Sequence, residues 1–104
     1  MKFIDVLKAL GDYNRLAIMC YLQNGMRCVC EIEQILSVSQ SATSKHLNKL
    51  RMAGLIEAQK KAQWVYYSIP DKVYIEYPFL ERLLMDANTH YVFDTSKVQK
   101  FDDC

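Results

Sequence analysis

The chain has 104 residues, of which 51% are hydrophobic and 24% charged, and its formal net charge is +1 at pH 7. This length accommodates one domain, and the composition is that of a globular protein and not of a disordered or low-complexity chain. Charged residues interrupt every apolar stretch before the about 18 residues that a membrane helix needs, and the start of the chain lacks the pattern of a signal peptide. We therefore expect a cytoplasmic protein that makes no membrane contact.

The first third of the chain is predicted to be helical. Apolar residues recur at helical spacing from Phe3 to Leu10, and Gly11 ends this first helix. Asp12 is the predicted N-cap of a second helix that runs to about Gln23, where Asn24-Gly25 stops it. A third helix is expected from about Cys28 to Leu36.

A fourth helix is predicted from Gln40 to about Ala53, with Ser39 as its N-cap and Gly54 as its stop. In this helix Ala42, Leu47 and Leu50 are placed to face the core, while the polar residues lie on other faces.

The pattern then changes to that of strands. Residues 55–59 and 64–69 are rich in β-forming residues, and the polar run 60–63 between them predicts a hairpin. A last helix is expected over 71–90, kinked or split by Pro78. We expect residues 1–91 to form the domain and residues 92–104 to form a short helix or a loose tail.

Basic charge is concentrated in the middle of the chain. Residues 1–38 carry four bases and four acids, residues 39–63 carry five bases against one acid, and residues 71–104 carry four bases and seven acids. Such a block suits contacts to phosphate, although charge taken alone is more often a solvated helix face.

Two short helices joined by a tight turn and followed by a basic hairpin predict a winged helix-turn-helix, mainly α with a β-hairpin wing. A helix fits the major groove of duplex DNA, and a wing can meet the adjacent backbone or minor groove. Some residues of this helix and wing also have a structural role as an alternative to DNA contact. Ser39 can be only a helix cap, His46 can pack against the body, and the wing lysines can protect an exposed hairpin edge from pairing with another chain. The residues expected to contact DNA are Ser39, Gln40, Ser41, Ser44, Lys45, His46, Lys49, Lys60, Lys61 and Gln63.

Three segments resemble the arsenic-responsive repressor (ArsR/SmtB) family. Residues 10–16 resemble the family's Leu-Gly-Asp-Pro-Thr-Arg-Leu signature, with Tyr13 in place of proline. Residues 39–47 resemble its recognition-helix motif, and residues 50–56 match the following Leu-Arg-x-Ala-Gly-Leu-Val. The resemblance covers about residues 3–85. It implies a homodimer, formed by the first and last helices, that represses transcription until an inducer binds.

Cys28 and Cys30 lie in a stretch, residues 26–32, that resembles the metal box of family members sensing arsenite, antimonite, or lead and cadmium. In the arsenite sensors a third cysteine occupies the position of Glu33. Side chains two residues apart point about 200° apart on a regular helix, so both sulfurs can bind one ion only if Cys28 precedes the helix. Cys28 and Cys30 are the predicted metal ligands.

Several candidates for the third ligand, and other uses of the pair, remain open. Cys104 is the candidate third ligand because it is terminal, whereas Cys20 in the second helix is expected to be buried packing. The pair can also be apolar filler, or a redox or persulfide switch that forms a disulfide with Cys104. A zinc or nickel site from Asp86 and His90 is a further alternative.

The sequence therefore predicts a DNA-binding repressor that arsenite, antimonite or another thiophilic ion releases from its operator. The alternatives are a thiol redox or persulfide-responsive repressor on the same fold, and a winged-helix module that binds protein. We expect no organic cofactor. An enzyme is not expected, because no nucleophile beside a base, phosphate loop or pocketed carboxylate pair is recognisable.

Overall fold

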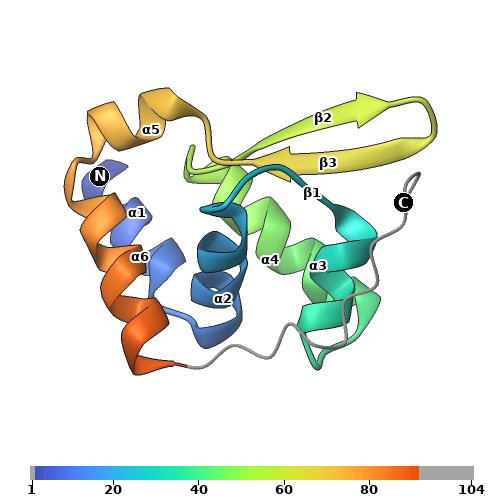
Figure 1. The fold of residues 1–104 in the computed structure, drawn as a ribbon, viewed down its shortest axis with the longest axis horizontal. Coiled ribbons are helices and arrows are strands. Elements are labelled where there is room, and N and C mark those ends of the chain that lie inside the picture. Colours follow the sequence, from blue (N-terminus) through green and yellow to red (C-terminus); the bar gives the residue numbers. More distant parts are fainter. Residues whose placement is uncertain (1, 92–104) are drawn as a thin grey trace.

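The computed structural model describes residues 2–91, which form a helical body with a β-hairpin projecting from it (Figure 1). The expected tail, residues 92–104, lies outside the described residues, and so does Cys104. Within residues 2–91, no helix is both long enough and apolar enough to span a bilayer.

The first two helices are α1, Lys2–Leu10, and α2, Tyr13–Leu22. The chain turns between them because Asp12 has an extended backbone and caps α2, its side chain accepting a hydrogen bond from the Arg15 N–H at 3.1 Å. The predicted helices and the predicted cap are confirmed.

A short strand that the sequence did not predict comes next. Strand β1, Arg27–Cys28, precedes helix α3, Val29–Ile35, so the expected helix start at Cys28 is wrong by one residue. Cys28 is instead the N-cap, and the Glu31 carboxylate accepts a hydrogen bond from the Cys28 N–H at 3.1 Å. This capping box stops α3 from extending backwards.

Helix α4, Gln40–Met52, begins at the predicted cap, since Ser39 Oγ accepts a hydrogen bond from the Ala42 N–H at 3.1 Å. Leu47 and Leu50 are buried as expected, but Ala42 is only half-buried. Thr43 takes the core position because its hydroxyl donates to the Ser39 carbonyl at 3.0 Å and needs no solvent. Gly54 follows α4 with a φ of +79°, the left-handed conformation that ends many helices.

The wing consists of β2, Glu57–Lys61, and β3, Trp64–Ser68. Lys61 pairs with Trp64, so the turn has two residues and the predicted loop over 60–63 is too long. Leu55 and Ile56, expected in the strand, are buried in the core instead. Strand β1 joins the sheet beside β3, with Cys28 opposite Tyr66, in the antiparallel order β1-β3-β2.

The last segment is split by Pro78, as predicted, into α5, Asp71–Glu76, and α6, Phe79–His90. Helix α6 packs against α2, and α3 packs against α4 below the sheet (Figure 1). The largest fully buried side chains come from every layer of the body: Val6, Ile18, Met19, Ile32, Leu47, Leu50, Leu55, Val73, Leu80 and Leu84.

Candidate DNA-binding surface and cysteine site

The N-terminal half of α4 presents a polar, exposed face. Ser39 is exposed at the cap, and four further predicted residues line a shallow hollow together with Asn48, which the sequence analysis did not single out. Asn48 lies one turn beyond Ser44 on the same helix face, so its spacing was the signal that was missed. The four residues are Gln40, Ser41, Ser44 and Lys45.

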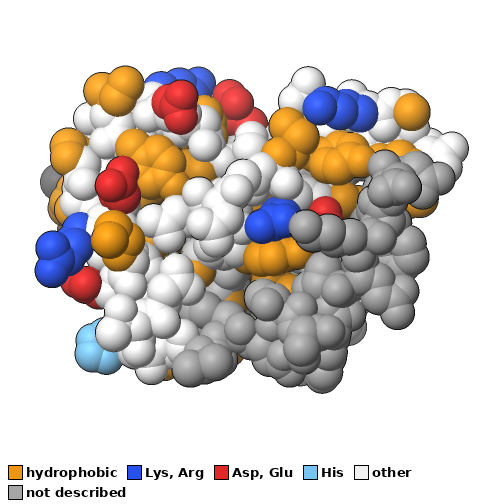
Figure 2. Space-filling model, viewed as in Figure 1, with side chains coloured by type: hydrophobic (Ala, Val, Ile, Leu, Met, Phe, Trp, Pro, Cys, Tyr) orange, Lys and Arg blue, Asp and Glu red, His pale blue; other side chains and the backbone are white. Residues whose placement is uncertain are grey.

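The wing carries the second group of predicted residues. Lys60, Lys61 and Gln63 are all exposed near the tip of the hairpin. The Lys61 Nζ lies 5.7 Å from the centre of the Tyr66 ring, which orients this ammonium along β3. Figure 2 shows a blue patch of basic side chain at the upper right, over the wing. Lys49 is exposed too, but it lines a cleft between α1 and α4 and not the hollow on the polar face.

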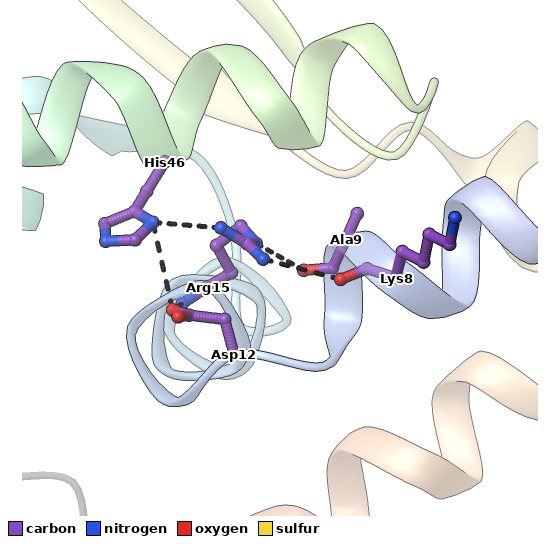
Figure 3. Close-up of polar contacts among 5 residues, drawn as sticks. All are labelled: Lys8, Ala9, Asp12, Arg15 and His46. Carbon is purple, nitrogen blue, oxygen red and sulfur yellow. Dashed lines mark hydrogen bonds and ion pairs between the residues drawn. The ribbon is translucent and has the colours of Figure 1, made fainter.

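His46 points away from the exposed face of α4, toward α2 (Figure 3). Its side chain is 17% exposed, and its Nδ1 lies 3.3 Å from a guanidinium nitrogen of Arg15. Since arginine only donates, Nδ1 is the acceptor in this contact. The Asp12 carboxylate lies 3.8 Å from the same Nδ1, an ion pair when His46 is protonated. The structure therefore places His46 in a packing position.

Arg15 is a residue that sequence reasoning missed. From α2, its Nε donates to the Ala9 carbonyl at 2.6 Å and its Nη2 to the Lys8 carbonyl at 3.4 Å. These carbonyls lie in the last turn of α1, where the Lys8 carbonyl also accepts a hydrogen bond from the Gly11 N–H at 3.3 Å. Arg15 thus connects α1, α2 and the exposed helix α4. A lone arginine in the apolar second helix was the available signal.

The two cysteines of the predicted metal box converge. Their Sγ atoms lie 2.7 Å apart, and Cys28 Sγ accepts a hydrogen bond from the Cys30 N–H at 3.3 Å. Cys28 is fully buried, whereas Cys30 is half-buried. This is the arrangement that the helix geometry required, because Cys28 precedes α3 and Cys30 lies in its first turn.

A polar network borders this pair. One Glu31 oxygen binds the Cys28 N–H, and the other accepts from the Tyr21 hydroxyl at 3.3 Å. The Arg27 guanidinium lies 4.4 Å above the centre of the Tyr21 ring. Burial, and then the nearby Glu31 carboxylate, raise the pKa of Tyr21, so its hydroxyl remains a donor.

The alternative ligands that lie within residues 2–91 are not brought to the pair. Cys20 is buried, its Sγ lies 3.7 Å from the Leu84 carbonyl, and burial raises the pKa of its thiol to about 11. This matches the expected packing role. Asp86 pairs with Arg82 at 3.2 Å. Within residues 2–91, no three or more His, Cys, Asp or Glu side chains are arranged to hold a metal ion.

An exposed polar helix, a short supporting helix before it and a basic hairpin after it define a winged helix-turn-helix DNA-binding protein. Residues 12–58 match the sequence model of the bacterial regulatory proteins of the arsR family. The chain belongs to this family of transcriptional regulators, in agreement with the expectation that it is not an enzyme.

Two curated relatives illustrate the range of the family. The arsenical resistance operon repressor of Bacillus subtilis is 43% identical over 72 residues, which cover 68% of this chain and 69% of the relative. The transcriptional activator HlyU of Vibrio cholerae is 40% identical over 90 residues, covering 84% of this chain and 82% of the relative.

Solved structures agree on the fold. The structure of HlyU from Vibrio cholerae superposes with a TM-score of 0.67 at 38% identity, covering 79% of this chain and 90% of that chain. The homodimeric winged helix-turn-helix domain of Mb0332 from Mycobacterium bovis has a TM-score of 0.69 at 26% identity, covering 86% of this chain and 84% of that chain.

Proposed function

We propose that this chain is a homodimeric repressor that leaves its operator when arsenite, or another thiophilic ion such as antimonite, binds Cys28 and Cys30. The observation that carries the proposal is the convergence of the two sulfur atoms at the start of α3. The relative named as an arsenical resistance operon repressor supports the choice of ion.

DNA binding is assigned to the exposed residues of α4 and the wing. Ser39, Gln40, Ser41 and Ser44 enter the major groove, because short polar side chains at the start of a helix reach base edges there. Lys45, Lys49, Lys60 and Lys61 neutralise phosphates, which makes the affinity depend on salt. His46 supports the helix through Arg15, and Gln63 contacts the backbone beside the wing.

Induction follows from the position of the cysteine pair. Each As–S bond forms as a hydroxyl of arsenous acid leaves as water with the thiol proton. Cys28 is both the cap of α3 and the partner of Tyr66 in the wing, so a shift of its sulfur strains both elements. A typical coupling free energy of about 1–3 kcal/mol between the ion and the DNA lowers DNA affinity about 5- to 150-fold.

A third sulfur completes the pyramid that arsenite prefers. No described residue supplies it, so we assign this role to Cys104, from the same or the partner protomer. Replacement of Cys104 by serine then weakens, but does not abolish, the response to arsenite.

The test is an electrophoretic mobility shift with the DNA upstream of the gene, with and without arsenite. The expected result is a shifted band that arsenite removes in the original protein and in the control variant Cys20→Ser. The double variant Cys28→Ser, Cys30→Ser binds the same DNA but does not respond. Release of the double variant by arsenite contradicts the site. A failure to bind duplex DNA at low salt contradicts the repressor and favours a protein-binding module.

A redox response is the second candidate, and the direct contact between the two sulfur atoms favours it. In this reaction two thiols lose two protons and two electrons to hydrogen peroxide, which is reduced to two waters. Mass spectrometry after peroxide or persulfide treatment distinguishes the candidates. A disulfide between Cys28 and Cys30, or a crosslink from either to Cys104, together with loss of DNA binding in the absence of metal, supports the redox candidate.

A further inference from the structure

Asn48 and Arg51 form a hydrogen-bonded pair on the exposed side of α4. The Arg51 Nη2 donates to the Asn48 Oδ1 at 2.9 Å, and both residues are exposed. They lie three positions apart, which places them on the same helix face. Asn48 lines the hollow that also contains Gln40 and Ser44, so the pair continues the polar face toward the C-terminal end of α4.

Arg51 also reaches a second hollow, at the base of the wing. This hollow lies between α4 and β2 and is lined by Arg51, Ile56, Glu57, Ala58, Gln59 and Ser68. The pair therefore connects the major-groove helix with the wing. The pair thus lies between the two elements that are assigned to DNA contact.

The hydrogen bond changes what Asn48 presents to a base. An isolated asparagine offers one acceptor and one donor, the combination that matches N6 and N7 of adenine. Because arginine has no acceptor, the amide must turn its oxygen toward Arg51 and its NH2 group outward. The oxygen retains a second lone pair, but it then lies beside a cationic guanidinium that offers only donors.

We propose that Asn48 and Arg51 act as one unit whose outward groups, the Asn48 NH2 and the Arg51 guanidinium, are all donors. This donor-only unit selects guanine over adenine at one base pair of each half-site. Guanine presents two acceptors, O6 and N7, in the major groove, whereas adenine presents one acceptor and one amino donor. The amino group of adenine meets donors on this unit and is rejected. This specificity rests on the proposed function, because it requires that α4 lies in the major groove.

The test begins with selection of binding sites from randomised duplex DNA by the original protein. The variant Asn48→Ala identifies the base pair that Asn48 contacts. At that position the selected sites no longer favour any base, while the base preferences at the other positions persist. At the base pair so identified, the original protein prefers guanine to adenine by about tenfold, the usual scale of a good side-chain contact to a base.

The decisive variant is Arg51→Leu, which removes the partner of the Asn48 oxygen. The amide can then turn to accept from N6 and donate to N7, so the preferred base changes from guanine to adenine. Lys49→Leu is the matched control, because it removes one positive charge from the same helix without touching Asn48. It lowers affinity for every sequence and leaves the preferred base unchanged.

The outcomes separate the two proposals. If the original protein selects no sequence, the repressor function itself fails. If it selects a site but Asn48→Ala flattens no position, or Arg51→Leu keeps the preference for guanine, the donor-only unit is wrong while the repressor function stands. Thermal melting of each variant verifies folding, which is expected to persist because both side chains are exposed.

Discussion

Arg15 links helix α4 to α1 and α2 through polar contacts. Its guanidinium binds two terminal carbonyls of α1 and the His46 ring of α4, all within 3.4 Å (Figure 3). Hydrogen bonds from a charged donor to partly buried acceptors contribute more than neutral surface bonds. The orientation of α4 therefore depends in part on a residue outside the surface proposed to contact DNA.

Replacement of Arg15 by methionine is expected to lower the free energy of unfolding by about 1–3 kcal/mol, because it leaves several acceptors without their charged donor. Urea unfolding measures the change. Arg82→Met is the matched control, since the exposed pair of Arg82 with Asp86 is worth about 0.5 kcal/mol or less. Equal losses of unfolding free energy in the two variants would show that the Arg15 contacts stabilise the protein no more than an exposed ion pair does.

Cys20 gives the stability of the protein a predictable dependence on alkaline pH. Burial holds the pKa of its thiol at about 11 in the folded chain, above the value near 9 of an exposed thiol. The unfolded chain therefore loses this proton first as pH rises, so stability is complete below about pH 9 and is lost as pH rises toward 11.

Between about pH 8 and pH 10.5, this thiol is expected to contribute a loss of about 1–2 kcal/mol in unfolding free energy. The variant Cys20→Ala is expected to be less stable at neutral pH but to show a flatter alkaline slope. Some slope remains because the pKa values of Tyr21 and Tyr74 are raised as well. Parallel slopes for the two proteins, measured by denaturant unfolding, would contradict the assignment.

At the scale of the element, the wing is built on an unfavourable turn. Its two turn residues are Ala62 and Gln63, and Ala62 has a φ of +55°. This left-handed conformation costs an L-residue roughly 1–2 kcal/mol, whereas glycine adopts it freely. The pairing of β2 with β3 offsets this conformational free energy. The paired residues run from Lys61 opposite Trp64 to Glu57 opposite Ser68.

Ala62→Gly is therefore expected to stabilise the protein by about 1 kcal/mol, measured by thermal or urea unfolding. Ala58→Gly makes the same chemical change within β2, where the backbone is extended, and is expected to destabilise by about 0.5–1 kcal/mol. Opposite signs at the two positions are the diagnostic result, and equal signs would rule out strain at the turn.

At the scale of the whole molecule, α1 is apolar on two faces. Val6, Ala9 and Leu10 are buried against the body. On the other side Phe3, Ile4 and Leu7 are between 42% and 51% exposed. The outward side of a helix on a globular domain normally carries polar residues, so three large apolar side chains there are unusual. The exposed face of α1 is thus our candidate contact for the proposed dimer; the Mycobacterium bovis domain with the same fold is homodimeric.

Leu7→Glu is expected to shift the proposed dimer to monomer, because it brings two like charges into the centre of a symmetric apolar contact. Light scattering coupled to gel filtration measures the mass. Ile75→Glu is the control, since Ile75 is 78% exposed on α5 and does not belong to the apolar face of α1, although the neighbouring Glu76 pairs with Lys2 at 2.9 Å. Dissociation by Ile75→Glu, or a stable dimer of Leu7→Glu, would place the interface elsewhere.

The boundaries of most elements were predictable because local groups determine them. Asp12 and Ser39 each cap a helix by binding an N–H three residues ahead, and Gly54 and Pro78 act through their own backbone. The polar face of α4 was predictable for the same reason, since helical periodicity places Gln40, Ser41 and Ser44. Each of these features involves interactions within a few residues of chain.

Other features depend on residues that are far apart in the sequence, and only the tertiary structure decided them. Strand β1 has two residues, too few for a pattern, and exists because Cys28 pairs with Tyr66. His46 is turned away from the exposed face by Arg15, 31 positions earlier. A local pattern shows which side chains share a face, but packing selects the face that meets the body, because burial is a property of the assembled core.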